Sequence, residues 1–345
     1  MGASIYLHLH SKQTIETIWG ESYDCEEALV TIMNTGVMQR LKGIDQSGPP
    51  RYVGPRLPVF SRFDHSVGVL VLLKKAKALF KEQVAGLLHD SSHTVFSHVG
   101  DYIFAKDIND NVKESYQDKN HLSHLQKAGI EAVLTKFGMS FNDLDLENAG
   151  YVRLEQPLPN MCADRIQYNI HTGVILRLIS KDDAAAIVSD LKFEDGDWYF
   201  SRKDLAKKFA DVSLYCTQNF WGAKWNTSMN IHFSAALRRA LAIGLIRMED
   251  LFATDDVVMA KLVKTDDGIV NTNLKQCEKY NEKIPGRKYD VKKFTPKFRG
   301  IDPWVKNAKS GKLERLTALD PMFESQYHAV KKWCSDGFEV AILAS

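Results

Sequence analysis

The sequence contains no long apolar run, no close cysteine pair and no excess of charge of one sign. No apolar stretch approaches the roughly 20 residues that a membrane-spanning helix needs, so no membrane partner is expected. Five cysteines are scattered without a CxxC pair, a pattern typical of reduced thiols in a cytoplasmic protein. The formal net charge is only +2, from 45 basic and 43 acidic residues. Any phosphate-binding surface must therefore be a local one.

The sequence does contain enough apolar residues, 44% of 345, for a sizeable core. Before residue 180, apolar residues recur at spacings of three and four, which predicts short helices joined by polar turns. Such helices are expected over 26–44, 66–80, 81–90 and 161–180. Four prolines and two glycines in 47–60 predict an unusually long loop between the first two.

The pattern changes after residue 190. The segment LKFEDGDWYFS predicts a short hairpin with its turn at Asp195-Gly196, and 203–247 returns to a helical pattern. Residues 262–313 are lysine-rich and broken, and GFEVAIL near the end favours a strand. We therefore predict an all-α core over 1–250 and a smaller mixed α/β appendage over 251–345.

Histidine and aspartate residues stand where the helical pattern predicts burial. An apolar helix ends in the adjacent pair His89-Asp90, His65 begins another helix, and Asp164 lies within an apolar stretch. Imidazole nitrogen and carboxylate oxygen together suit divalent ions such as Mn, Fe, Co, Ni or Zn. Buried polar groups without partners would cost several kcal/mol each. The pattern therefore indicates a metal site with positions left for phosphate and water.

Four segments carry a resemblance to a known family: MQRLKGIDQSG, SRFDHSVGVL, VAGLLHDSSHTVFSH and CADRIQYNIHTG. They resemble the HD-domain phosphohydrolases, most closely the deoxynucleoside triphosphate triphosphohydrolase branch. The resemblance covers residues 35–180 well and 203–247 more loosely. It implies a helical HD-domain core that binds a divalent metal ion, with Mg added to the ions named above.

The resemblance also assigns roles to individual residues. The implied metal ligands are His65, His89, Asp90 and Asp164. The implied catalytic and supporting groups are His93, His98, Asp101 and His124. As a mechanistic hypothesis, we expect Asp101 to orient His93 for proton transfer. The implied substrate contacts are Arg62 and Arg165 to phosphate, Tyr168 to the sugar, and Gln46 to the sugar 3′-hydroxyl. Arg suits phosphate because its planar fork donates two hydrogen bonds at once.

Two departures from the family pattern bear on these roles. Ser91 and Ser92 fill the gap in which the family commonly has a glycine, although the spacing from His89 to His93 is kept. Thr172 stands where the triphosphohydrolases often carry an aspartate that pairs with the glutamine on the 3′-hydroxyl. The first departure bears on the local turn, whereas the second weakens the case for selectivity toward deoxynucleotides and leaves the metal chemistry untouched.

The expected function is hydrolysis of (deoxy)nucleoside triphosphates to nucleoside and inorganic triphosphate, with attack at the α-phosphorus. One alternative is an HD-type nucleotidase or phosphodiesterase acting on monophosphates, cyclic nucleotides or short oligonucleotides. Another is a nucleotide-sensing or nucleic-acid-binding module, motivated by the basic stretch 283–299, although a solvated charged face is the favoured interpretation there. An effector nucleotide and a homo-oligomer are further expectations from the family. A single metal is preferred, although His121 and His124 have the spacing that completes a two-metal centre in some relatives.

Overall fold

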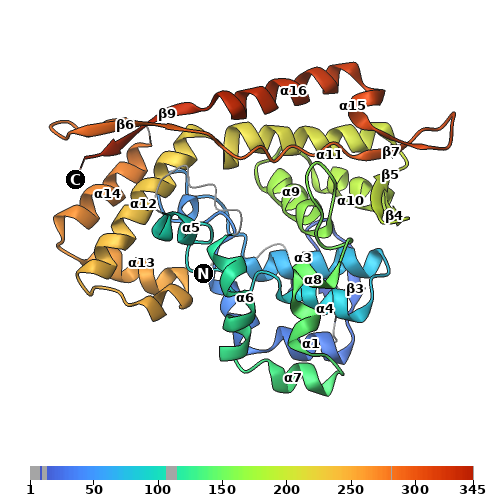
Figure 1. Cartoon of the computed structure of the whole chain (residues 1–345), viewed down its shortest axis with the longest axis horizontal. Helices are drawn as coiled ribbons and strands as arrows, with labels where there is room; N and C mark the ends of the chain where they lie inside the picture. Colours follow the sequence, from blue (N-terminus) through green and yellow to red (C-terminus); the bar gives the residue numbers. More distant parts are fainter. Residues whose placement is uncertain (1–7, 10–13, 106–114, 281, 345) are drawn as a thin grey trace.

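The computed structural model describes residues 8–9, 14–105, 115–280 and 282–344, most of them in helices (Figure 1). The helices before residue 191 are α1 (Glu27–Met33), α2 (Gly36–Arg40), α3 (Arg62–Lys75), α4 (Phe80–Leu88), α5 (Val99–Phe104), α6 (Tyr116–Lys127), α7 (Glu131–Lys136), α8 (Leu146–Ala149), α9 (Ala163–Ile175) and α10 (Lys181–Asp190). Those after it are α11 (Lys203–Cys216), α12 (Lys224–Ala242), α13 (Asp255–Lys264), α14 (Gly268–Lys279), α15 (Leu316–Leu319) and α16 (Pro321–Asp336). Shorter 3-10 turns are η1 (Leu41–Gly43), η2 (Pro49–Arg51), η3 (Phe141–Leu144) and η5 (Met248–Phe252), and η4 (Thr217–Trp221) is a π-helical turn.

Helix α3 is the central element of the fold. Ser61 caps it by accepting the backbone N–H of Asp64, and the Asp64 side chain accepts the Ser61 N–H in return. Every residue from Arg62 to Leu73 is buried. The helix packs against α4 and α9, so it has no face left for solvent. Polar side chains on α3 therefore face other protein groups, and His65 is one of them.

Three small sheets accompany the helices. Strands β1 (His8–Leu9), β2 (Thr14–Glu16) and β3 (Ser22–Asp24) form one, and β6 (Tyr289–Phe294) pairs antiparallel with β9 (Phe338–Leu343). The third has the order β4 (Leu191–Glu194), β5 (Asp197–Phe200), β7 (Trp304–Lys306), β8 (Leu313–Arg315). The predicted hairpin is confirmed: β4 and β5 are joined by Asp195 and Gly196, both with positive φ, as a type I′ turn requires.

The predicted fold class is confirmed, a helical core with a smaller mixed part, and the predicted C-terminal strand is β9. Two expectations were wrong. The N-terminal segment contains β1 to β3 rather than helices only, and the lysine-rich stretch contains the regular helix α14. The sheet that joins β5 to β7 crosses residue 250, so the division into two domains at that point stays a prediction.

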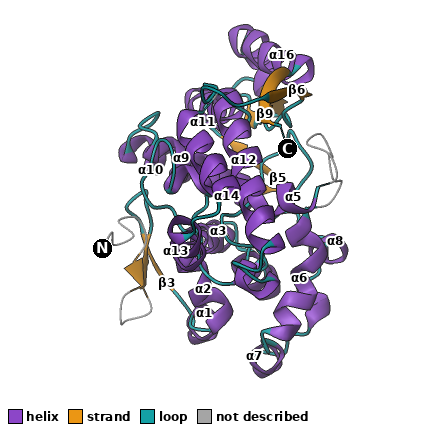
Figure 2. Ribbon diagram, turned by 90° about the vertical axis from the view of Figure 1, so that its left-hand side faces the viewer, coloured by secondary structure: helices purple, strands orange, loops and turns teal. Residues whose placement is uncertain are grey.

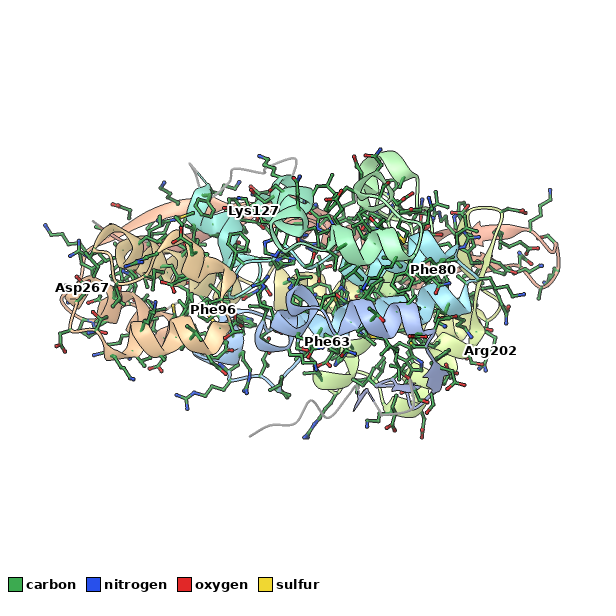
Figure 3. All side chains as sticks on the ribbon, turned by 90° about the horizontal axis from the view of Figure 1, so that it is seen from below. Phe63, Phe80, Phe96, Lys127, Arg202 and Asp267 are labelled. Atoms are coloured by element: carbon green, nitrogen blue, oxygen red, sulfur yellow. The ribbon has the colours of Figure 1, made fainter. Side chains whose placement is uncertain are left out.

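Figures 2 and 3 show how the core and surface are distributed. The elements α16, β6 and β9 lie at one end of the molecule and α1 and α7 lie at the other (Figure 2). Phe63 and Phe96 are buried, whereas the charged Lys127 and Arg202 are exposed (Figure 3). All five cysteines are buried and unpaired. Among the described residues, no helix has the length and apolar character needed to cross a membrane.

The segment between β6 and β7 runs along α11, beneath α16 in Figure 1. Ser213 on α11 fixes it from both sides: its hydroxyl donates to the carbonyl oxygen of Arg299 (3.1 Å) and accepts the N–H of Ile301 (3.2 Å). Pro296 lies so close to Gly222 that a Cβ at residue 222 would be 3.2 Å from the proline Cβ. A part of the C-terminal region is thereby fixed against η4 and α11.

Two buried carboxyl groups tie loops together beside α3. Asp255 accepts the backbone N–H groups of Asp45 (2.8 Å) and Phe96 (2.6 Å), and Asp45 accepts those of Ser47 (2.8 Å) and Phe60 (3.2 Å). Burial raises the pKa of each carboxyl to about 7, although these hydrogen bonds act in the opposite direction.

The raised pKa of Asp255 predicts a pH-dependent stability. A carboxyl whose folded-state pKa lies above its unfolded value of about 4 stabilises the fold fully only below that unfolded value. The contribution is lost as the pH rises through about 7. We expect the free energy of unfolding in urea to fall from pH 5 to pH 8, and to fall less in Asp255→Asn. The exposed Asp266→Asn is the control, and an equal fall in Asp255→Asn would contradict the prediction.

Candidate metal centre

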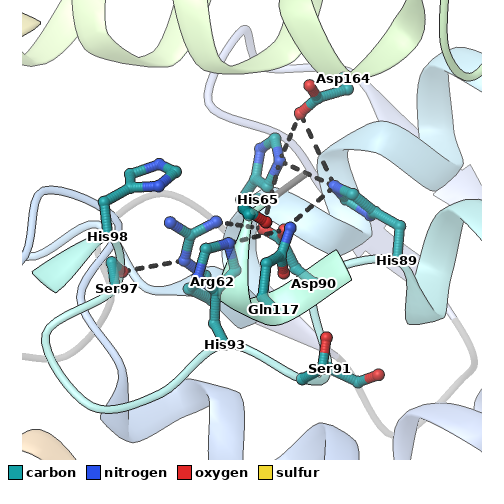
Figure 4. A network of polar contacts seen from close by, with 12 residues as sticks. Arg62, His65, His89, Asp90, Ser91, His93, Ser97, His98, Gln117 and Asp164 are labelled. Carbon is teal, nitrogen blue, oxygen red and sulfur yellow. Dashed lines mark hydrogen bonds and ion pairs between the residues drawn. The ribbon is translucent and has the colours of Figure 1, made fainter. Parts of the chain in front are cut away.

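The predicted metal ligands come together from three helices (Figure 4). His65 lies in the first turn of α3, and Asp164 lies in the first turn of α9. His89 is the residue that directly follows the end of α4, and Asp90 comes next. Because α4 ends at this point, both members of the adjacent pair reach the same space, which a continuing helix would prevent by pointing them about 100° apart.

The donor atoms converge closely. The Nε2 atom of His65 lies 3.0 Å from Oδ1 of Asp164, 3.2 Å from Nε2 of His89 and 3.5 Å from Oδ2 of Asp90. The Nε2 atom of His89 lies 3.5 Å from Asp90 Oδ1 and 3.6 Å from Asp164 Oδ1. Ligands at about 2.1 Å from a common ion lie about 3 Å from one another when they are adjacent in its coordination sphere. The donor separations therefore match those of a coordination shell.

Hydrogen bonds set the tautomers of both histidines. The Nδ1 atom of His65 lies 2.5 Å from Oε1 of Gln167, and Nδ1 of His89 lies 2.7 Å from the carbonyl oxygen of Gly86. Since an oxygen of this kind accepts, each Nδ1 carries the proton and each Nε2 directs its lone pair toward the other. Two such nitrogens and two carboxylates facing one another need positive charge between them, which a proton supplies in the metal-free cluster and a metal ion can supply in its place. The donor set thus fits a divalent ion.

The electrostatics of the metal-free cluster agree with this need for positive charge. Burial alone would lower the pKa of His89, yet the carboxylates of Asp90 and Asp164 raise it to about 9. Both carboxyl groups have lowered pKa values because nearby cationic groups outweigh the effect of burial. A proton on His89 is therefore the group that a metal ion would displace.

Arg62 is placed differently from the substrate contact that the resemblance implies. Its side chain is buried, and one Nη1 atom lies 2.6 Å from Oδ2 of Asp90 while Nε donates to the hydroxyl of Ser97 at 2.9 Å. Its Nη2 atom is buried and has no hydrogen-bond partner among the described residues. The guanidinium thus faces a proposed metal ligand. Its contact with phosphate stays a prediction, and Nη2 is the guanidinium nitrogen left to make that contact.

The predicted pairing of His93 with Asp101 is wrong. Nε2 of His93 lies 3.3 Å from Oδ1 of Asp90, and Asp101 instead faces Nδ1 of His98 at 3.6 Å. His93 is buried, whereas the side chain of His98 is 51% exposed. Burial and the charge of Arg62 lower the pKa of His93 to about 3 despite the opposing effect of Asp90, so its imidazole is neutral at neutral pH.

Two further histidines lie on α6. His124 stacks on Phe252 with a centroid separation of 5.0 Å, and Nδ1 of His121 lies 3.2 Å from the hydroxyl of Ser92. Their Nε2 atoms are buried without a hydrogen-bond partner in the described part of the chain. Burial lowers the pKa of both to about 4. Ser92, which stands in the gap where the family commonly has a glycine, therefore orients His121.

The other predicted substrate contacts lie around the cluster. Gln46 is held by its backbone N–H, which donates to the carbonyl of Phe60 (2.7 Å), and its buried Oε1 has no partner among the described residues. The ring of Tyr168 lies 6.4 Å from that of His65 and packs edge-on against Trp221 at 5.1 Å. Trp221 thus supports the residue assigned to the sugar.

Arg165 forms an ion pair with Glu155 and donates to the carbonyl of Asn160 (3.2 Å). Its guanidinium also lies 3.3 Å from the sulfur of Cys162. Glu155, Cys162 and Asp164 form a second group whose donor atoms lie within 4.8 Å of one another. Because Arg165 already places its positive charge beside two of them, this group is a poor site for a second cation.

Three residues near the cluster were missed. Gln117 on α6 points toward it in Figure 4, and its buried Oε1 has no partner among the described residues. The charge of Arg299 acts on the pKa of Tyr168, and the charges of Arg299 and Arg165 lower the pKa of Lys297. Lys297 and Arg299 belong to the basic stretch interpreted as a solvated face. Only their docking against α11 places them here, and no local signal in the sequence indicates it.

Comparisons with known proteins find relatives of this chain over nearly its whole length. The chain is 30% identical over 325 residues to the uncharacterized protein YdhJ of Bacillus subtilis, covering 92% of this chain and 96% of YdhJ. It is 33% identical over 177 residues to the metal-dependent phosphohydrolase cns2 of Cordyceps militaris, covering 51% of this chain and 49% of cns2. The chain belongs to the HD-domain phosphohydrolase family. No family model matches the sequence.

Other matches of this HD-domain phosphohydrolase are more distant. The deoxynucleoside triphosphate triphosphohydrolase SAMHD1 of Homo sapiens is 29% identical over 153 residues, which is 39% of this chain and 24% of SAMHD1. A solved phosphohydrolase from Bacteroides thetaiotaomicron has a TM-score of 0.71 at 15% identity, covering 96% of this chain and 98% of that one. A hypothetical protein from Aquifex aeolicus has a TM-score of 0.66 at 15% identity, covering 95% of each chain. The two solved structures show that the fold is shared over nearly the whole length.

Proposed function

We propose that this metal-dependent phosphohydrolase hydrolyses (deoxy)nucleoside triphosphates to nucleoside and inorganic triphosphate. The convergence of His65, His89, Asp90 and Asp164, with both Nε2 lone pairs directed inward, carries the proposed metal site. When bound there, a divalent ion such as Mn, Fe, Mg, Co, Ni or Zn supplies positive charge to the phosphate and lowers the pKa of water. The assignment of a triphosphate as the substrate rests on separate observations.

Positive charge around the cluster supports a substrate with several phosphates. The charges of Arg165 and Arg299 both act on Lys297, and Arg165 follows directly after the proposed ligand Asp164. Like charges gathered beside a site are unfavourable without an anion, and a phosphate chain would relieve that repulsion. The partial match to SAMHD1, a triphosphohydrolase by name, supports the same substrate class.

The neutral histidine beside the cluster suits a role in proton transfer. In the proposed reaction a water oxygen bonds to the α-phosphorus, the bond from phosphorus to the 5′ oxygen breaks, and triphosphate and nucleoside separate. We assign the role of base to His93 because its imidazole is uncharged and lies beside the cluster, where it can accept the proton of water. The 5′ oxygen then takes up that proton. Asp90 orients the imidazole from 3.3 Å.

The identity of the products tests this proposal. With dATP, dGTP, dCTP and dTTP and with Mn, Mg, Co or Ni, we expect nucleoside and inorganic triphosphate as the products, separated by ion exchange and identified by mass. In water enriched in oxygen-18, the label is expected in triphosphate and absent from the nucleoside, because phosphorus and not carbon is attacked. Orthophosphate or a nucleoside monophosphate as the product would contradict the triphosphohydrolase assignment.

One observation favours a second candidate, a nucleotidase or phosphodiesterase of the same family. Thr172, at the position where an aspartate would assist recognition of the 3′-hydroxyl, is buried on α9. Gln46 would then have no acidic partner at that position. This candidate would be supported if the enzyme hydrolysed monophosphates or cyclic nucleotides but left nucleoside triphosphates intact. Binding of nucleic acid by the basic stretch, an effector nucleotide and a homo-oligomer remain proposals from the sequence.

A further inference from the structure

Gln167 holds the first metal ligand in place. It is fully buried on α9, and its Oε1 lies 2.5 Å from Nδ1 of His65. Only the oxygen of the amide can accept the His65 Nδ1–H that leaves Nε2 free for a metal ion. The opposite orientation would direct an amide N–H at Nδ1, which would move the imidazole proton to Nε2. The direction of this amide therefore determines whether His65 can bind metal.

His171 fixes that direction. It lies one helical turn after Gln167, and its Nδ1 atom is 3.2 Å from Nε2 of Gln167. Burial holds the pKa of His171 well below its ordinary value, so the ring is neutral and its Nδ1 can accept the amide N–H. The ring is fully buried and stacks on Phe60 at 3.5 Å, with an angle of 18° between the planes. A fully buried, stacked ring has little freedom to turn away.

Gly68 provides the space for Gln167. It lies one turn after His65 on α3, on the side of that helix that faces α9. A Cβ at residue 68 would lie 2.6 Å from Nε2 of Gln167 and 2.7 Å from its Cγ. Both distances are far shorter than van der Waals contact, so any larger residue there would displace the amide. Glycine is required here for close approach, although it weakens helices elsewhere.

We propose that Gly68, Gln167 and His171 form a positioning unit that holds His65 in its metal-binding tautomer. The proposal rests on the metal site described above. The unit is a chain of hydrogen bonds from His171 through Gln167 to His65. Gly68 has no side chain, which leaves room for the Gln167 amide against α3. A glutamine takes the place of the carboxylate or backbone carbonyl that usually orients a metal-binding histidine. Unlike those groups, an amide needs a second partner to set its direction.

The proposal is tested by titrating the full-length chain, first freed of metal with a chelator, with Mn²⁺ in a calorimeter. Gln167→Ala and Gly68→Ala are each expected to weaken Mn²⁺ binding by roughly 10–100-fold, the usual cost of losing an outer partner of a metal ligand. His171→Leu removes the acceptor but keeps a side chain of similar bulk, and a smaller loss is expected. Gln167→Glu keeps an oxygen toward His65 and should bind Mn²⁺ at least as tightly as the wild type.

The double variant distinguishes positioning from general damage to the core. If Gly68 acts through Gln167, Gly68→Ala with Gln167→Ala together should weaken binding no more than Gln167→Ala alone. His232→Ala is the matched control, because His232 is a buried histidine on α12 whose imidazole contacts Ser228 and the backbone of Leu343. It should lose stability but keep its Mn²⁺ affinity.

The positioning unit would be overturned by additive losses in the double variant, or by wild-type affinity in Gly68→Ala and Gln167→Ala. A wild-type chain that binds no Mn²⁺ would overturn the metal site itself, so the two failures are distinguishable. Thermal unfolding in the presence of chelator reports folding separately from metal binding. A Gln167→Glu variant that bound as weakly as Gln167→Ala would also contradict the proposal, because it restores the acceptor.

Discussion

Replacing His89 by Ala and Asp90 by Asn together is expected to abolish metal binding and phosphohydrolase turnover. Two of the four converging donors are altered, and each lies within 3.6 Å of another donor. The loss should exceed the roughly 100-fold that removal of an outer partner costs. Metal content measured by mass spectrometry and product release measured under metal excess test this expectation. Far-UV circular dichroism should stay that of the wild type.

The choice of Asn rather than Ala at residue 90 follows from Arg62. The Arg62–Asp90 ion pair is buried, and an alanine would leave Nη1 of Arg62 without its acceptor. Asn keeps an oxygen toward Arg62 while removing the negative charge that a metal ion needs. His232→Ala again serves as the buried-histidine control. Retention of metal at wild-type stoichiometry in the double variant would show that the ion is held elsewhere.

The proposed metal ligands could be predicted from the sequence because each stands at a local boundary. His65 follows a capped helix start, His89 and Asp90 end an apolar helix, and Asp164 begins another. Helix periodicity reveals such boundaries, and the polar residues in apolar surroundings stand out against it. The turn at Asp195-Gly196 was predictable for the same reason, since its backbone conformation is specified by the two residues themselves.

The partners of these residues could not be predicted, because pairing depends on packing between distant segments. Asp101 is eight residues from His93 and three from His98, and helical geometry in α5 brings it to the nearer histidine. Arg299 lies more than 130 residues beyond Arg165 and approaches the site only because Ser213 holds its backbone. The role of Gly68 depends on how closely α9 packs against α3, and the sequence of α3 gives no sign of that packing.

Arg62→Met is expected to destabilise the metal-free fold by about 3–5 kcal/mol, the usual cost of breaking a buried ion pair by removing one partner. Arg62 is 2% exposed, and its removal would leave the Asp90 carboxylate uncompensated. A divalent ion bound at Asp90 would replace the lost positive charge. Mn²⁺ should therefore raise the melting temperature of Arg62→Met more than that of the wild type.

Arg165→Met is the matched comparison, because Glu155, its ionic partner, is exposed. Its stability should change by no more than about 1 kcal/mol, while the KM for a nucleoside triphosphate rises. The two arginines are therefore expected to differ in role: Arg62 supports the proposed metal ligand Asp90, and Arg165 binds phosphate. Urea unfolding with and without Mn²⁺, together with steady-state kinetics, measures both effects. If Arg62→Met kept its stability and raised only KM, Arg62 would be a phosphate contact, because a guanidinium that neutralises Asp90 cannot be removed without cost to the metal-free protein.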